Sequence, residues 1–219
     1  MRVKINFLVF VIASCLLSCS QNNNAAEKKD TADTAKLTIV KQNSTDEYLI
    51  TDTSIGKINK ETTYKDLQGL FGNNLQDTID YGPEGADSFT VTKLYPNTSR
   101  ELTIQWQPDK LHMHISSIEC YNENSPYHTA DSLKAGSTLE TLLKINGQKI
   151  SFYGTGWDYG GIITSYNNGK FKKSNIYFQL ATKEGASEKV MGDRELNTDM
   201  PVVKANLQKI YISKVSVSF

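Results

Sequence analysis

The segment TTYKDLQGLFG at residues 62–72 recurs without gaps as STLETLLKING at residues 137–147. Each copy opens with hydroxyl residues, which cap helix N-termini, and then places apolar side chains at helical spacing. Each copy closes on a glycine, Gly72 or Gly147, of the kind that ends a helix in a left-handed conformation. We therefore expect two short amphipathic helices related by an internal repeat of 75 residues.

Segments downstream of the two predicted helices repeat as well. LTIQW at residues 102–106 matches IYFQL at residues 176–180, and HISSIECY at residues 114–121 matches YISKVSVS at residues 211–218. Their alternating and β-rich composition predicts strands. In the second pair the alternation changes phase at the same place in both copies, which predicts a β-bulge in each. The expected fold class is α+β, with two tandem helix-plus-antiparallel-sheet repeats packed as one two-layer unit.

The predicted boundaries place repeat 1 at residues 36–121 and repeat 2 at residues 122–219. The two strand matches have offsets of 74 and 97 residues, so the second repeat carries about 23 additional residues between its last two strands. They fall at about residues 181–205, a polar stretch with two glycines and a proline. We expect a surface excursion there. Long loops of this kind are often functional or disordered, and the composition favours neither.

Residues 1–18 have the order of parts found in a signal peptide. Arg2 and Lys4 precede an apolar run of 14 residues, which is shorter than the roughly 18 to 20 residues that a membrane-spanning helix needs. Leu16, Leu17 and the small residue Ser18 stand immediately before Cys19. This segment resembles the signal of bacterial lipoproteins, which implies a lipid on Cys19 and removal of the preceding residues.

Cys15 is a competing acylation site, because small residues precede it too. We prefer Cys19, since cleavage before Cys15 would leave two leucines exposed at the start of the mature chain. In bacterial lipoproteins, Ser20 beside the cysteine implies sorting to the outer membrane. We expect a lipid-anchored protein there, with the periplasmic face favoured over the cell surface.

Residues 20–35 contain no aromatic or large aliphatic side chain, so they cannot bury enough apolar surface to order themselves. Together with Cys19 they form a predicted flexible tether, residues 19–35, whose average span is about 20 to 24 Å. Without Arg2 and Lys4 the chain has 22 basic and 24 acidic residues, a net charge of about −2. This balance does not favour nucleic acid as a partner.

Cys120 is the cysteine that remains once Cys15 leaves with the signal and Cys19 carries lipid. A disulfide within one mature chain is therefore not expected. Cys120 stands in the apolar alternation of a predicted strand, and no pattern of histidine or carboxylate around it suggests activation. We expect a small buried hydrophobe.

GTGWDYGG at residues 154–161 is the most distinctive stretch of the chain. Trp157 and Tyr159 beside Asp158 have the composition of a protein-binding hot spot. Asp-Tyr-Gly also occurs at residues 80–82, and this recurrence favours a turn in both halves. In such a turn the aspartate closes a local hydrogen bond, the glycine adopts positive φ and the tyrosine packs on the sheet. Trp157 has no counterpart in the first copy and is the stronger binding candidate.

His112 and His114 form an H-x-H pair on one face of a predicted strand, but no third ligand follows nearby. We expect them to face solvent, and we expect neither a metal nor another cofactor. Common catalytic and nucleotide-binding motifs are missing from the sequence. Carboxylates such as Glu101 and Glu119 could meet in space, although most carboxylates of this kind solvate the open face of a sheet.

Two tandem units, each a short helix that opens in a hydroxyl-rich turn, ends in glycine and precedes antiparallel strands, resemble the β-lactamase inhibitor protein superfold. The small outer-membrane lipoproteins of the β-barrel assembly machinery resemble a single such unit. The resemblance covers residues 48–219 and implies helices on one face of a sheet, with the other surface presented to a protein partner. The additional segment at 181–205 departs from a simple duplication.

These observations predict a cell-envelope protein that is held to the membrane by lipid on Cys19, binds another envelope protein and has no catalysis of its own. The predicted contacts are Trp157, Asp158, Tyr159, Trp106 and the segment at 181–205. One alternative is a binding module for a small envelope ligand, a glycan or lipid, that uses the same aromatic residues. A further alternative is a hydrolase with acidic residues assembled across the two halves.

Labelled palmitate tests the predicted anchor. Incorporation should be lost in Cys19→Ala and retained in Cys15→Ala, because only the cysteine at the cleavage site receives lipid. Labelling that survives in Cys19→Ala would assign the anchor to another residue.

Overall fold

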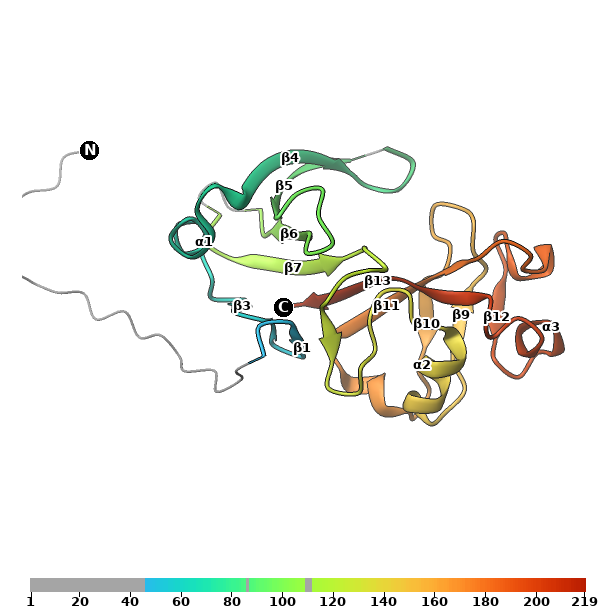
Figure 1. Ribbon diagram of the computed structural model, residues 1–219. Coiled ribbons are helices and arrows are strands. Elements are labelled where there is room, and N and C mark those ends of the chain that lie inside the picture. The colour runs from blue at the N-terminus through green and yellow to red at the C-terminus, as the bar shows by residue number, and fades with distance from the viewer. Residues whose placement is uncertain (1–45, 86, 109–111) are drawn as a thin grey trace, which may run out of the picture. The chain divides into compact units, whose positions relative to one another are not determined.

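The computed structural model describes residues 46–85, 87–108 and 112–219 and confirms a mixed α+β fold (Figure 1). The predicted signal peptide, Cys19 and the tether lie outside the described residues. The helices are α1 (Tyr64–Phe71), α2 (Leu139–Asn146) and α3 (Pro201–Lys204), with 3₁₀ turns η1 (Gly72–Asn74), η2 (Pro83–Gly85), η3 (Lys170–Lys173) and η4 (Glu188–Val190). The strands are β1 (Leu49–Thr51), β2 (Ser54–Ile55), β3 (Ile58–Asn59), β4 (Leu75–Tyr81), β5 (Ser88–Leu94), β6 (Leu102–Trp106), β7 (Ile115–Cys120), β8 (His128–Thr129), β9 (Ser151–Tyr153), β10 (Ile163–Ser165), β11 (Ile176–Thr182), β12 (Glu195–Asn197) and β13 (Ile210–Ser218).

Both predicted helices form, and both start at the predicted hydroxyl residue. Thr63 caps α1 and Thr138 caps α2, each accepting a hydrogen bond from a backbone N–H three residues later. Gly147 ends α2 in the left-handed conformation, with φ 72° and ψ 1°. Gly72 also has positive φ, but its ψ of −125° lies outside the left-handed helical region, so the expected C-cap holds for α2 alone.

A six-stranded antiparallel sheet in the order β11-β13-β7-β6-β5-β4 is the centre of the fold. Its two faces follow from strand alternation. One row of directly opposed residues crosses the whole sheet on the face that builds the core: Ile176, Val217, Ile118, Ile104, Thr92 and Asp77. We call this the covered face and its opposite the open face.

Both predicted β-bulges are confirmed. In the first, the neighbouring residues Gln105 and Trp106 of β6 oppose Ser117 and Ile115 of β7, so Ser116 of β7 is the extra residue. On β13, Gln179 of β11 opposes Lys214 while Leu180 opposes Ile212, which skips Ser213. The skipped residues occupy the same position in the two aligned segments, 97 residues apart.

The pairing of β7 with β13 joins the two halves of the sheet. In the alignment of the two segments, Ile118 matches Val215 and Cys120 matches Val217. In the sheet the partners are exchanged, because Ile118 opposes Val217 and Cys120 opposes Val215. Glu119, between them, opposes Ser216, the residue that aligns with Glu119 itself. This exchange is the register that a local twofold axis through the Glu119–Ser216 pair would produce.

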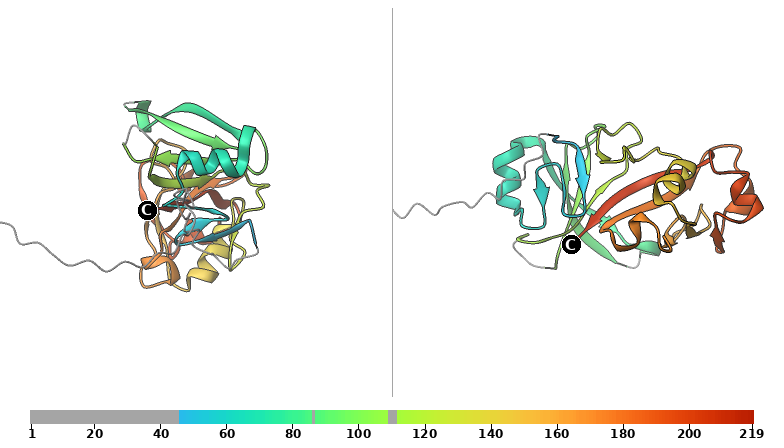
Figure 2. Two further views of the ribbon diagram at one scale, coloured as in Figure 1. Left: turned by 90° about the vertical axis from the view of Figure 1, so that its left-hand side faces the viewer. Right: turned by 90° about the horizontal axis from the view of Figure 1, so that it is seen from below.

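Helices and short strands form a second layer over the covered face. Leu67 of α1 and Leu139 and Leu142 of α2 are fully buried in one hydrophobic core with the inward side chains of the sheet. Ile50 and Ile55, from the small sheet β3-β2-β1-β8, belong to the same core. Figures 1 and 2 show α2 and β1–β3 on one side of the six-stranded sheet.

The segment at 181–205 is not the surface excursion that its composition suggested. Strand β12 pairs antiparallel with β9 and completes the sheet β10-β9-β12. Val190, Leu196 and Val203 are at most 4% exposed and belong to the core. A few well-spaced apolar residues are therefore enough to fold this polar segment against the second half.

Two further expectations have different outcomes. Cys120 is buried, as predicted, and burial raises the pKa of its thiol, which donates to Ser125 Oγ at 3.0 Å. The prediction that His112 and His114 share one strand face is wrong, because β7 begins only at Ile115 and His112 has a φ of 48°. In the described part of the chain, no three His, Cys, Asp or Glu side chains gather as metal ligands would. No helix among the described residues is long and apolar enough to cross a bilayer.

The two helix caps provide a matched pair for a stability test. Asp66 accepts hydrogen bonds from the Thr63 hydroxyl at 2.7 Å and from the Thr63 N–H at 2.9 Å, and these bonds lower the pKa of its carboxyl. The aligned position in α2 is Thr141, which does not titrate in this range. Because the pKa is lowered on folding, the Asp66 contribution is present above the unfolded pKa of about 3.9 and is lost as the pH falls further.

Thr63→Ala and Thr138→Ala should each cost about 1 kcal/mol of unfolding free energy at pH 7. Below about pH 4 the cost of Thr63→Ala should shrink, whereas that of Thr138→Ala should not. Urea titrations at pH 7 and pH 3 measure both. An equal pH response of the two variants would rule out the Asp66 contribution.

Candidate functional site

A buried ion pair lies at the middle of the open face. Glu119 is only 6% exposed, and its carboxylate accepts from Lys214 Nζ at 3.2 Å and from the Tyr121 hydroxyl. Lys214 also lies 5.6 Å from the centre of the Tyr121 ring. Burial, followed by the negative charge of Glu119, raises the pKa of Tyr121. The hydroxyl therefore stays protonated and donates to the carboxylate.

Tyr153, Trp157 and Tyr159 form an aromatic group beside this ion pair on the open face. The ring centres of Trp157 lie 6.1 Å from Tyr153 and 5.5 Å from Tyr159, both edge to face. The Trp157 indole donates to the Gly154 carbonyl at 2.8 Å, so its polar atom is satisfied within the loop. Tyr153 and Tyr159 remain 37% and 41% exposed.

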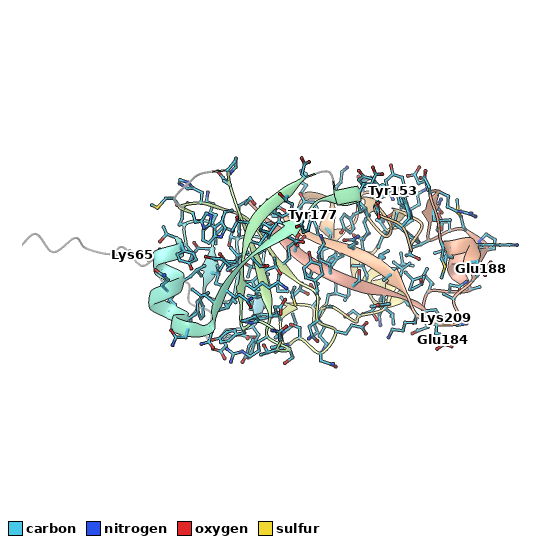
Figure 3. All side chains as sticks on the ribbon, turned by 90° about the horizontal axis from the view of Figure 1, so that it is seen from above. Lys65, Tyr153, Tyr177, Glu184, Glu188 and Lys209 are labelled. Carbon is cyan, nitrogen blue, oxygen red and sulfur yellow. The ribbon has the colours of Figure 1, made fainter. Side chains whose placement is uncertain are left out.

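Strand pairing connects this group to the six-stranded sheet. The Tyr153 N–H donates to the Ile162 carbonyl, and Ile162 forms a bridge with Gln179 of β11. Gln179 in turn opposes Lys214. Tyr177, two residues before Gln179 and on the same face, is 48% exposed, and Figure 3 shows it on the same side of the molecule as Tyr153.

We call this surface the apolar stripe. It runs across the open face from β7 to β9, with the Lys214–Glu119 pair beside Tyr121. Its members are the exposed Tyr121, Tyr153, Tyr159, Ile162 and Tyr177 and the half-buried Trp157.

Carboxylates border the apolar stripe. Glu195 of β12 is exposed and opposes Tyr153 of β9. Asp158 is exposed between the stripe residues Trp157 and Tyr159. Asp80, on the open face of β4, is close enough to raise the pKa of Tyr121 by its charge. These three carboxylates supply negative charge at the rim of the stripe.

Backbone contacts on both sides hold the GTGWDYGG loop in place. The Gly154 N–H donates to the Arg194 carbonyl, and the Thr155 N–H donates to the Val190 carbonyl, both from the 181–205 segment. On the other side Leu180 N–H donates to the Gly161 carbonyl at 2.8 Å. The 181–205 segment thus supports the apolar stripe by fixing the loop that carries Trp157.

The expected Asp-Tyr-Gly turn forms in the second half but not in the first, and neither half has the predicted positive φ at the glycine or the packed tyrosine. Asp80 and Tyr81 end strand β4, whereas Asp158 and Tyr159 lie in a turn that the Gly160 N–H closes on the Trp157 carbonyl. Neither Gly82 nor Gly160 has positive φ. Gly160 is needed for space, because a Cβ there would lie 2.8 Å from the Trp157 carbonyl oxygen. Both tyrosines are exposed instead of packed on the sheet.

Trp106 lies on the covered face, away from the apolar stripe. Its indole donates to Thr92 Oγ1 at 2.9 Å, and Thr92 Oγ1 donates to Asp77 at 2.7 Å. The His112 ring stacks on Trp106 at 5.0 Å, and Tyr64 meets both rings edge to face. These contacts tie the start of α1 to the end of the sheet, so Trp106 and Trp157 do not share a surface.

The two carboxylates considered from the sequence have separate partners. Glu101 accepts from Lys93 Nζ at 2.9 Å and from the Asn97 N–H, whereas Glu119 accepts from Lys214 and Tyr121. They are not an acid–base pair in the described structure. Tyr177 was not among the predicted contact residues. The alternation in IYFQL nevertheless places its side chain on the other face of the sheet from Ile176 and Phe178, which predicts its exposure.

The fold and this surface together define an α+β domain whose antiparallel sheet has helices and short strands on one face and exposed aromatic side chains on the other. No protein-family model matches the chain, and comparison with curated proteins finds no match. Among solved structures the chain is similar to the uncharacterized protein yfeY from Escherichia coli, with a TM-score of 0.44 and 11% identity, over 78% of this chain and 99% of that chain.

Gly161 and Gly156 test how tightly the loop is held. Both have positive φ, 74° and 82°, but a Cβ at Gly161 would lie 1.8 Å from the Leu180 carbonyl oxygen, whereas nothing lies within 4 Å at Gly156. Gly156→Ala should cost about 1 kcal/mol of unfolding free energy from backbone conformation alone. Gly161→Ala should cost roughly 3 kcal/mol or more, because Leu180 must move as well. Denaturant unfolding measures both, and equal costs would contradict the close approach.

Proposed function

We propose that the chain is a lipid-anchored cell-envelope protein that binds another envelope protein through the apolar stripe and has no catalysis of its own. One observation carries the binding part of this proposal: five exposed apolar or aromatic residues and the half-buried Trp157 lie on a side of the sheet that none of the described helices packs against. Large contiguous apolar surfaces on a folded domain mark sites of association. The anchor and the location rest on the predicted signal and Cys19.

The stripe has the physical properties of a protein-binding surface. Tyrosine and tryptophan offer large contact areas with few rotatable bonds, so little side-chain entropy is lost when a partner binds. Trp157 is already positioned by its hydrogen bond to Gly154 and by two neighbouring rings. Such preorganisation lowers the cost of association.

The charge around the stripe indicates what kind of partner fits. Asp80, Asp158 and Glu195 border it, and Lys214 is engaged with Glu119. Complementary charge at an interface rim speeds encounter and sets orientation. The proposed partner is therefore a protein whose contact surface has an apolar centre with lysine or arginine around it.

The Glu119 group supports a binding role. Both carboxylate oxygens accept hydrogen bonds, from Lys214 and from Tyr121, and these contacts hold the Tyr121 ring beside the stripe. A partner that covers this pair would strengthen it by excluding water. Because Glu119 and Lys214 are paired with each other, neither charge would be left unpaired in the interface.

Site-specific photo-crosslinking in intact cells tests the proposal. A crosslinking residue at Tyr177, in the stripe, should capture one stoichiometric protein, and the same residue at the exposed Gln68 on α1 should not. The purified pair should then bind at least about thirtyfold more weakly with Trp157→Ala, the loss typical of a hot-spot residue.

Tyr81→Ala is the matched control. Tyr81 is 65% exposed but lies on the covered side of β4, outside the stripe, so its loss should leave the affinity unchanged. Thermal melting of each variant checks that the fold is intact. Recovery of the same abundant proteins from Tyr177 and Gln68, or equal affinities for the two alanine variants, would contradict the proposal.

A further inference from the structure

A cavity of about 760 Å³ lies on the covered side of the fold, between the end of α2, α3 and two loops. Leu143 and Leu207, both packed on the core, contribute its apolar lining. Its polar lining includes Gln148, Asn168 and Thr198. The apolar stripe is on the opposite face of the sheet, so this cavity plays no part in the proposed protein interface.

The cavity is rimmed by lysines in a protein that is almost neutral overall. Lys144, Lys149 and Lys204 line it, against one carboxylate, Asp199. Asp199 lies 4.0 Å from Lys204 Nζ, whereas within the described residues neither Lys144 nor Lys149 has an ion pair. Lys172 stands nearby, with its ammonium 2.6 Å from Asn168 Oδ1. The local charge is therefore clearly positive.

The walls of the cavity are fixed before any ligand arrives. Asn146 is 3% exposed at the end of α2, and its amide donates to the carbonyls of Gln148 and Tyr166 while its oxygen accepts from the Phe171 N–H. Asn167 donates to the Lys149 carbonyl at 2.8 Å. Through these bonds, loops distant in sequence hold the lysine-bearing backbone in one arrangement.

We propose that this cavity binds a phosphate ester of a small polyol. Lysine ammonium groups bind phosphate as point charges, and Lys144 and Lys149 together would offset its charge of about −1.5 to −2. The amide side chains of Gln148 and Asn168 would meet hydroxyl groups, and the leucine floor would meet the carbon skeleton. Such a group occurs both in free phosphorylated polyols and in phospholipid headgroups. The first described strand, β1, lies on this same side of the sheet (Figure 1). The experiment therefore tests both a free ester and a lipid headgroup.

The test uses the full-length chain in non-ionic detergent micelles, followed by amide NMR. Added sn-glycerol 3-phosphate should give saturable shifts at residues 143–149, 167–168 and 198–207, and glycerol at equal concentration should not. Lys144→Gln with Lys149→Gln should weaken binding by about tenfold or more, a change of about 1.4 kcal/mol. Lys65→Gln, an exposed lysine on α1 at the far end of the molecule, should leave it unchanged (Figure 3).

The source of the phosphate is decided by a second arm. Shifts of the same residues when the micelles contain phosphatidylglycerol, but not phosphatidylcholine, would assign a lipid headgroup. Shifts with the soluble ester alone would assign a free ligand. Shifts that do not saturate, or equal affinity in the double lysine variant, would overturn the proposal. None of these outcomes depends on the apolar stripe, so the two proposals fail or hold separately.

Discussion

Four residues of β7 pair with four residues of β13, and the rest of the structure depends on this contact. On the covered face the pairing brings Ile118 against Val217 and Cys120 against Val215, which joins the cores of the two halves. On the open face it brings Glu119 within reach of Lys214. A shift by one residue would bury the charged side chains and expose the apolar ones, so the core and the apolar stripe require the same register.

The features that the sequence predicted well are those encoded by neighbouring residues. Thr63 and Thr138 lie directly before their helices, and the bulges at Ser116 and Ser213 appear as a change of phase within one strand. The 181–205 segment was misjudged because its order comes from a distant pairing of β12 with β9. Three apolar residues spread through a polar stretch give no periodic signal.

The candidate site shows the same division. Trp157 and Tyr159 could be singled out from composition, but their grouping with Tyr177 requires the bridge between Ile162 and Gln179. Trp106 looked equally suitable, yet it shares the covered face with Ile104, two residues earlier. The lysines of the cavity lie up to 60 residues apart, on α2, a loop and α3, and nothing in the sequence indicates that they meet.

The position of β13 has a consequence for how the chain reaches its fold. β7 lies inside the sheet, but its partner begins at Ile210, 90 residues after Cys120. Until that strand is made, β7 is an uncovered edge with unpaired backbone groups, the kind of surface that recruits other chains. Closing so long a loop is slow compared with forming local hairpins. A chain built this way is protected from such pairing only once its last strand has been made and has docked against β7.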